Sequence, residues 1–202
     1  LIDRGFDSAR ILLDVKDRIE NNKSFKIEYL AGDHELMMFQ EFQATGYDFF
    51  NKKTWSEELT KCYVTNGINI TVEELNERNL SKEQLVDIVK FVSNLKLYHK
   101  FEEKINDKNI VLVHAKCPEE IHDICDLRIK DNNQLVSDLV WTRRKNYEDR
   151  IGNKDYFTIV GHEPLINLHG YLYFSDQNYM DIYGGCASYV CGDDRYDHVA
   201  LL

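Results

Sequence analysis

The sequence Ile110-Val111-Leu112-Val113-His114 is a short, continuous apolar run that ends in a histidine. Runs of this length and composition are typical of strands that are buried on both faces of a sheet. The pattern recurs in Phe157-Thr158-Ile159-Val160, which is followed by Gly161-His162. Because the ends of strands in one sheet can meet at a common edge, we expect the two histidines to lie close together.

A third segment leads to a similar end. Phe25-Lys26-Ile27-Glu28-Tyr29-Leu30 alternates apolar and charged residues before Gly32-Asp33-His34. This pattern predicts a strand with Asp33 and His34 at its C-terminal end. Since imidazole and carboxylate groups are suitable ligands for manganese, iron or zinc, residues Asp33, His114 and His162 form a candidate metal site.

Several segments have the features of helices. Apolar residues recur at helical spacing up to about residue 22, and residues 35–44 have good helix propensity without a breaker. Thr71-Val72-Glu73-Glu74 and Ser81-Lys82-Glu83-Gln84 both match the capping box, so a helix is expected to begin at each. Asn66-Gly67 predicts a tight turn.

Further strands are predicted in the second half of the chain. Residues 97–105 alternate in character and precede Asn106-Asp107-Lys108-Asn109, which has the composition of a hairpin turn. Strand-like runs also lie near residues 171–174, 179–182 and 199–202. Because helices separate the strands and polar residues gather at strand ends, we expect an α/β fold, a β-sandwich with flanking helices and a site along one rim.

Composition narrows the class of protein. A chain of 202 residues with 43% hydrophobic residues can form one substantial core, so we expect a single domain over residues 1–202. A net charge of -10 disfavours nucleic acid as a partner. The absence of any run of about 18 apolar residues disfavours a membrane span.

The number and spacing of the cysteines indicate the cellular compartment in which the protein is expected to occur. Five cysteines without a dense, regular spacing favour a reducing environment, and we therefore expect a cytoplasmic protein. A zinc site built on Cys117, His122 and Cys125 is disfavoured, because no fourth ligand follows at a recognised spacing.

A set of short motifs occurs in a fixed order along the chain. They are Leu1-Ile2-Asp3-Arg4-Gly5, Gly32-Asp33-His34-Glu35, Val113-His114-Ala115, Val140-Trp141-Thr142-Arg143 and Val160-Gly161-His162-Glu163-Pro164. The first two resemble the end of GDxxDRG and the motif GNHE. Together the set resembles the metal-dependent phosphoprotein phosphatases, a branch of the calcineurin-like metallophosphoesterases, over nearly the whole chain. The similarity is greatest to the serine/threonine phosphatases of bacteria and lambda-type phages.

This resemblance implies a fold and an activity. The fold would be that of a calcineurin-like metallophosphoesterase that lacks its N-terminal βαβ portion in this chain. The activity would be dinuclear-metal-dependent hydrolysis of phosphomonoesters, by a serine/threonine or dual-specificity protein phosphatase. The substrate would be a phosphoprotein or a small phosphoester, attacked by a metal-bridging hydroxide while a histidine acts as general acid.

The resemblance also implies roles for individual residues. Asp33, His114 and His162 would bind the second of two divalent ions, with manganese the first choice and iron or zinc the alternatives. His34 would be the general acid, and Asp3 would orient it by accepting a hydrogen bond from its ring. Arg4 and Arg143 would bind the phosphate, because a guanidinium grips phosphate oxygens bidentately.

Three features depart from the family's pattern. Asp33 stands where the family has Asn, so an ionised carboxylate would add negative charge and partly offset the electrophilicity of the metal. The segment Met180-Asp181-Ile182-Tyr183-Gly184-Gly185 contains one residue more than the family's Asp-x-Gly turn. The GDxHG motif and the Gly-Asp that precede Leu1 in the family are missing, so we expect the chain to be N-terminally incomplete and the first metal's ligands to lie upstream.

Two alternatives stay open at this point. A dinucleoside-polyphosphate hydrolase on the same fold would share the histidine and W-x-R elements, although His114-Ala115-Lys116-Cys117-Pro118 looks more like the lambda-type segment. A pseudophosphatase or partner-binding protein is expected if the upstream metal motifs are truly absent. The sequence indicates neither the physiological substrate nor the oligomeric state.

Overall fold

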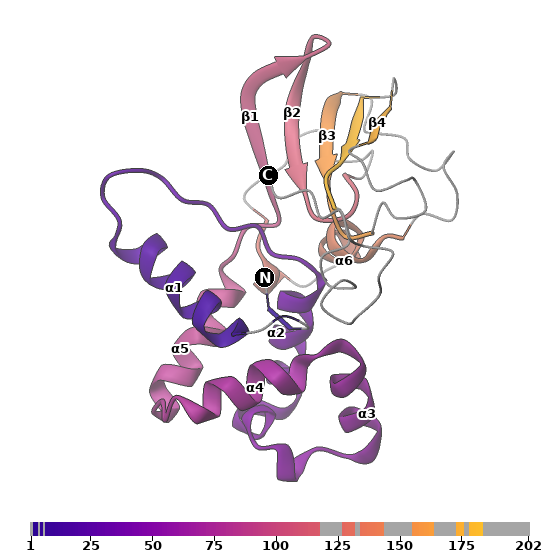
Figure 1. Cartoon of the computed structure of the whole chain (residues 1–202). Coiled ribbons are helices and arrows are strands. Elements are labelled where there is room, and N and C mark those ends of the chain that lie inside the picture. The colour runs from indigo at the N-terminus through magenta and orange to yellow at the C-terminus, as the bar shows by residue number, and fades with distance from the viewer. Residues whose placement is uncertain are drawn as a thin grey trace. The chain divides into compact units, whose positions relative to one another are not determined.

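The computed structural model describes residues 2–3, 5, 7–117, 127–131, 134–143, 155–163, 173–175 and 178–183 (Figure 1). The chain forms two compact units. The helical unit comprises Leu1–Tyr29 and His34–Leu95, and the sheet unit comprises Leu30–Asp33 and Lys96–Leu202. Helices and a mixed sheet together make the protein α/β, as predicted. Among the described residues, every helix is too short or too polar to cross a membrane.

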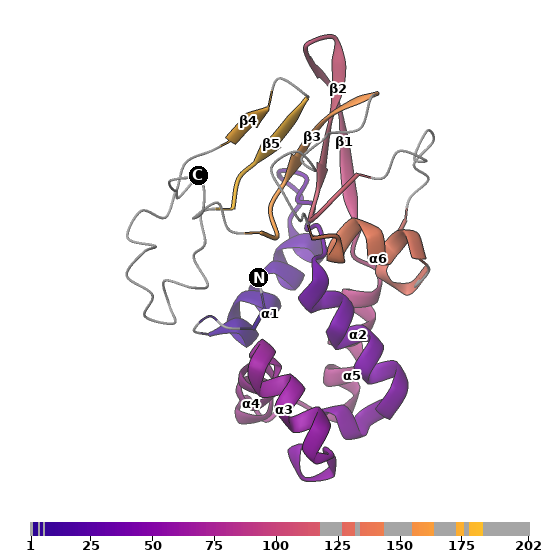
Figure 2. The same cartoon turned by 90° about the vertical axis from the view of Figure 1, so that its right-hand side faces the viewer.

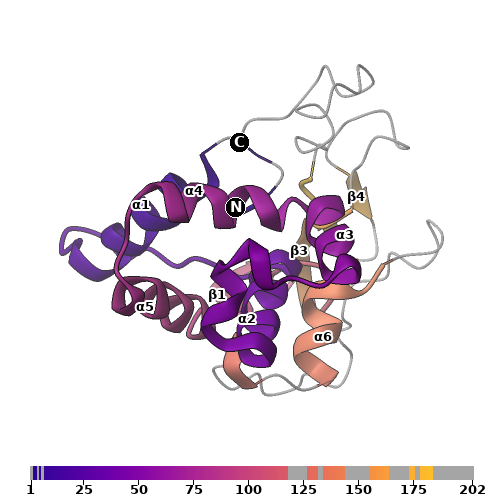
Figure 3. The same ribbon diagram turned by 90° about the horizontal axis from the view of Figure 1, so that it is seen from below.

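The helical unit is built from short helices around an apolar core. Its elements are α1 (Ser8–Asn21), α2 (Asp33–Thr45, whose first residue belongs to the sheet unit), η1 (Gly46–Phe50), η2 (Lys52–Thr54), α3 (Glu57–Asn66), α4 (Ile68–Glu77) and α5 (Lys82–Ser93). Within it, α4 packs against both α1 and α3 (Figure 3). Helices α1 and α2 confirm the two that helical spacing and propensity predicted.

Of the two predicted capping boxes, one is confirmed. The Ser81 hydroxyl accepts a hydrogen bond from the Gln84 backbone, and the Gln84 side chain accepts one from the Ser81 backbone, at the start of α5. The helix predicted to begin at Thr71 is wrong in its start, because α4 begins at Ile68 and Thr71 lies inside it. Gly67, with a φ of 80°, ends α3 and precedes α4 directly, so no loop leads up to Thr71.

The sheet unit contains one mixed sheet among its described residues. Its strands are β1 (Tyr98–Ile105), β2 (Lys108–Val113), β3 (Tyr156–Val160), β4 (Tyr173–Ser175) and β5 (Tyr179–Asp181), in the order β1-β2-β3-β5-β4 (Figure 2). Strands β2, β3 and β5 are parallel, whereas β1 and β4 pair antiparallel at the two edges. The predicted sandwich, which needs a second sheet, stays a prediction.

The strands β1 and β2 form the predicted hairpin. Asn106 and Asp107 at its turn have φ values of 52° and 63°. Two successive left-handed residues match the type I′ turn, whose twist suits an antiparallel pair. The apolar runs 110–113 and 157–160 form the ends of β2 and β3, as expected.

The strand predicted over residues 25–30 is wrong. Within this segment only Leu30 pairs with another chain segment, through one parallel bridge to Lys96. Phe25 is 63% exposed, and Lys26 pairs with Glu28 instead of facing a neighbouring strand. Alternation produces a ladder only where a second strand lies alongside, and none does here among the described residues. The strand predicted over residues 199–202 lies outside the described residues.

Helix α6 (Gln134–Trp141) lies between β2 and β3 in the sequence, after the short helix η3 (Ile129–Asp131). It buries Val136, Leu139 and Val140, and its Leu139 carbonyl accepts a hydrogen bond of 2.8 Å from the Ala115 backbone. A strand, a helix and a parallel strand form a crossover unit, which places the carboxyl ends of both strands at one edge of the sheet.

Candidate metal centre

Two of the predicted ligands come from neighbouring parallel strands. His114 directly follows β2, and His162 lies two residues beyond β3. The strands pair in register, with Leu112 opposite Ile159, and the Gly161 backbone donates a hydrogen bond of 2.9 Å to the His114 carbonyl. The sheet therefore delivers both imidazoles to the same edge.

The third predicted ligand, Asp33, reaches the same edge from the segment Leu30–Asp33. Leu30 bridges Lys96, and the Ala31 backbone donates a hydrogen bond of 2.8 Å to the Lys96 carbonyl. These two contacts fix the backbone just before Asp33. Asp33, His114 and His162 thus all belong to the sheet unit, although up to 129 positions, from 33 to 162, separate them in the sequence.

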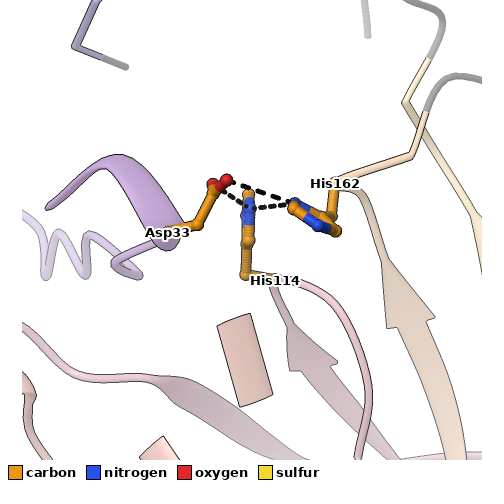
Figure 4. A group of neighbouring side chains, drawn as sticks. All are labelled: Asp33, His114 and His162. Atoms are coloured by element: carbon orange, nitrogen blue, oxygen red, sulfur yellow. Dashed lines mark hydrogen bonds and ion pairs between the residues drawn. The ribbon is translucent and has the colours of Figure 1, made fainter. Parts of the chain in front are cut away.

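The three side chains point toward one another (Figure 4). His114 Nε2 lies 2.9 Å from Asp33 Oδ1 and 3.1 Å from His162 Nδ1, and His162 Nδ1 lies 3.7 Å from Asp33 Oδ2. One ligand atom from each residue can be chosen so that all lie within 4.8 Å of one another. This is the spacing of donors around a single small cation.

The donor set fits a divalent transition metal. Two imidazoles and one carboxylate suit manganese, iron or zinc. The ring nitrogens of His114 and His162 face each other, and a cation between them would accept both lone pairs. The side chains of Asp33 and His162 are only 10% and 5% exposed, and His162 Nε2 is buried without a hydrogen-bond partner among the described residues. A metal on Nδ1 would fix the tautomer of that ring.

Gly32 gives His114 the space it occupies. A Cβ built on Gly32 would lie 2.7 to 2.9 Å from three atoms of the His114 ring, which is closer than real Cβ contacts. The imidazole therefore packs directly on the Gly32 backbone, and a side chain at position 32 would displace the His114 ring.

His162 sits in a tight turn. Its φ is 67°, and the Glu163 backbone donates a hydrogen bond of 2.8 Å to the Gly161 carbonyl across it. A left-handed residue other than glycine costs about 1 to 3 kcal/mol and is found at ligand-binding sites. The turn aims the His162 ring at His114 instead of continuing the line of β3.

The predicted acid pair is formed inside the helical unit. His34 Nδ1 lies 2.7 Å from Asp3 Oδ2, with the Asp3 side chain 1% and the His34 side chain 17% exposed. Asp3 Oδ1 accepts a second hydrogen bond, of 2.5 Å, from the Thr71 hydroxyl. The carboxylate thus holds the ring through one oxygen and is itself held through the other.

The remaining predicted residues have different outcomes. Arg4 lies outside the described residues. Arg143 is exposed, two residues beyond the end of α6. Asp181 is fully buried at the end of β5, opposite Val160 of β3, and its carboxylate accepts a hydrogen bond from the Tyr183 backbone.

The sequence pattern did not indicate the contact of Thr71 with Asp3 or the hydrogen bond between Tyr29 and Glu35. Thr71 was interpreted as a helix cap, and only its contact with Asp3, 68 residues away, shows its use. The Tyr29 hydroxyl donates a hydrogen bond to the buried Glu35 carboxylate. Burial raises the pKa of the Tyr29 phenol well above its usual value, and the charge of Glu35 raises that pKa further.

Comparison with known proteins gives no relative: no protein-family model, curated protein or solved structure matches this chain significantly.

Proposed function

We propose that this protein is a metal-dependent phosphomonoester hydrolase, acting as a serine/threonine or dual-specificity protein phosphatase. The observation that carries the proposal is the convergence of Asp33, His114 and His162, whose ligand atoms lie within 4.8 Å of one another. The hydrogen-bonded Asp3–His34 pair supports it. The resemblance of the surrounding motifs supplies the substrate class, a phosphoprotein or a small phosphoester.

The residues have separate tasks in this proposal. Asp33, His114 and His162 would hold a divalent ion, manganese in the first instance. Such ions, when bound, polarise the phosphoryl oxygens and acidify water. His34 donates a proton to the leaving oxygen while Asp3 orients its ring. Arg143 and Arg4 bind the phosphate oxygens.

Metal binding is the first test of the proposal. Titration calorimetry with Mn²⁺ is expected to show one site, and His114→Ala is expected to weaken binding by more than about 100-fold, since it removes a direct ligand. His99→Ala is the matched control, because His99 lies on β1 and packs on Phe101, with ring centroids 4.4 Å apart. Equal Mn²⁺ affinity in the wild type and His114→Ala would contradict the site.

Activity is the second test, and it uses the purified protein. With Mn²⁺ it is expected to hydrolyse an aryl phosphate and a serine- or threonine-phosphorylated peptide, and His34→Asn is expected to lower kcat by about 100-fold or more. Diadenosine tetraphosphate is the competing substrate. A strong preference for it would replace the phosphatase by a dinucleoside-polyphosphate hydrolase, and Mn²⁺ binding without hydrolysis of any of these substrates would favour a binding protein.

A further inference from the structure

Thr71 makes an unusual contact for a residue inside a helix. It is the fourth residue of α4, where a threonine hydroxyl commonly bonds the carbonyl four residues earlier. Instead, its hydroxyl donates a 2.5 Å hydrogen bond to Asp3 Oδ1 and accepts one of 3.1 Å from the Asp3 backbone N–H. Both residues are buried, with exposures of 2% for Thr71 and 6% for Asp3.

Asp3 needs this support because of its own backbone. Its φ is 64°, in the left-handed region that L-residues other than glycine seldom adopt. Such a conformation persists only where the surroundings hold it. The Thr71 hydroxyl is hydrogen-bonded to both the N–H and the carboxylate of Asp3. These two bonds determine the position of Asp3 and the direction of its side chain.

Asp3 connects Thr71 to His34 through hydrogen bonds of its two carboxylate oxygens. Asp3 Oδ1 is held by Thr71, while Asp3 Oδ2 lies 2.7 Å from His34 Nδ1. With Nδ1 donating to Asp3, His34 Nε2 is the nitrogen that is left to carry a transferable proton. The chain Thr71–Asp3–His34 therefore links a helix interior to the proposed general acid.

Among the described residues, the surroundings offer no substitute for the hydroxyl. Asp3 and Thr71 line a hollow whose other walls are apolar, and it has no room for a water molecule. Its other lining residues are Ile2, Met38, Phe49, Ile68 and Val72. If the Thr71 hydroxyl is lost without a change of shape, Asp3 Oδ1 loses its donor and no water replaces it.

We infer that Thr71 is a positioning residue for the proposed phosphatase reaction, since it holds Asp3 in the strained conformation that orients His34. The expected effect of Thr71 on catalysis rests on the proposed function. The geometry of Thr71, Asp3 and His34 lies wholly within the helical unit and carries the structural part by itself.

The test compares two substitutions at one position. Thr71→Val keeps the shape and removes the hydroxyl, whereas Thr71→Ser keeps the hydroxyl. Thr71→Val is expected to lower kcat by about 10- to 100-fold with KM changed less than about threefold, because misorientation of the acid affects the transition state. Thr71→Ser is expected to recover most of that loss. Thr65→Val is the matched control, because the Thr65 hydroxyl bonds the Lys61 carbonyl on the exposed face of α3.

A spectroscopic measurement separates this inference from the proposed function. In the wild type and Thr71→Ser, proton NMR is expected to show a downfield, slowly exchanging His34 Nδ1–H, assigned by its loss in His34→Asn. That resonance is expected to disappear in Thr71→Val. Should Thr71→Val fail to fold by circular dichroism, Thr71→Ala, with the strongest helix former, takes its place.

The outcomes are distinct. If Thr71→Val keeps the resonance and the wild-type kcat, or if Thr71→Ser behaves as Thr71→Val does, the inference is wrong and the proposed function stands. If the wild type hydrolyses no phosphoester, the proposed function fails, and the resonance alone decides whether Thr71 positions Asp3 and His34. Absence of the resonance in the wild type overturns the inference.

Discussion

At the residue scale, the candidate metal site depends on Gly32, which has no side chain. Gly32 precedes Asp33 and lies under the His114 ring, where a Cβ would come within 2.7 Å of a ring carbon. Its φ is not in the left-handed region, so the requirement comes from space and not from backbone conformation. A methyl group at position 32 would therefore affect two of the candidate ligands. It would press on the ring of His114, and it would stand next to Asp33 in the sequence.

Replacing Gly32 by alanine tests this packing. The new methyl is expected to push the His114 ring away from Asp33, which weakens Mn²⁺ binding by about 10- to 100-fold, the usual effect of changes around metal ligands. Because the ring is the movable end of a half-buried side chain, the fold is expected to survive. Calorimetry measures the affinity and circular dichroism the fold. Wild-type affinity in Gly32→Ala would show that the ring does not need this space.

Asp33 is the other residue whose chemistry can be tested, because the resembled family has Asn in its place. Asp33→Asn removes one negative charge from a side chain that is 10% exposed. We expect Mn²⁺ affinity to fall by about tenfold or more, since a neutral amide oxygen is a weaker donor to a hard cation than a carboxylate. Titration calorimetry at pH 7 measures this. Tighter binding in the variant would contradict a direct role for the Asp33 charge.

At the element scale, the start of α1 is held from α4. Asp7, before α1, has a φ of 65° and makes no side-chain cap. The Glu74 carboxylate replaces that cap, with one oxygen accepting from the Asp7 N–H at 2.9 Å and the other from the Ala9 N–H at 2.8 Å. A carboxylate at a helix N-terminus satisfies free donors and complements the helix dipole. Helix α4 therefore holds both Asp3 and the helix that follows it.

Glu74→Gln tests this cap. An amide offers only one acceptor atom, so one backbone N–H is left unpaired, and the free energy of unfolding is expected to fall by about 1 to 2 kcal/mol. Glu73→Gln is the control on the same helix, because Glu73 forms only a half-exposed ion pair with Lys52, which is expected to contribute less than about 1 kcal/mol. Urea denaturation measures both. Equal losses in the two variants would mean that the cap adds nothing specific.

At the scale of the whole molecule, two tyrosines whose hydroxyls bond to carboxylates, Tyr29 and Tyr63, link stability to alkaline pH. Burial and the charge of Glu35 raise the pKa of Tyr29 well above 10.0. Burial and the hydrogen bond to Glu41 likewise raise the pKa of Tyr63. Both phenols hold their protons more tightly in the folded than in the unfolded chain. Their contribution is fully present below about pH 10, the pKa of an unfolded tyrosine, and is lost as the pH rises further.

This linkage predicts the pH dependence of unfolding. Above about pH 10 the free energy of unfolding is expected to fall by about 1.4 kcal/mol per pH unit for each such tyrosine. In Tyr29→Phe the free energy of unfolding is expected to decline less steeply above pH 10, by about 1.4 kcal/mol per pH unit. Below pH 10 its slope is expected to match that of the wild type. Urea titrations at a series of pH values measure this slope. The same slope above pH 10 in both proteins would show that Tyr29 ionises equally in the folded and unfolded chain.

Much of the local structure could be predicted from the sequence alone. The apolar runs that became β2 and β3, the α1 periodicity, the Ser81 capping box and the turn at Asn106 all depend on neighbouring residues. The prediction that Asp33, His114 and His162 converge was also made from sequence. Its reasoning holds for His114 and His162, which follow the parallel strands β2 and β3, whereas Asp33 reaches the same edge from a segment that forms no strand. These features follow from conformational preferences and side-chain periodicity, which the sequence contains directly.

Only the tertiary structure decided the features that need a distant partner. Residues 25–30 alternate as a strand does, yet among the described residues only Leu30 forms a strand-like pair, because a ladder requires a second chain segment alongside. Thr71 matches a helix cap, yet it binds Asp3, which is 68 residues away. Gly32 is needed because the ring of His114 packs on it. The energy of each contact depends on which segments meet after folding, and local sequence does not specify that.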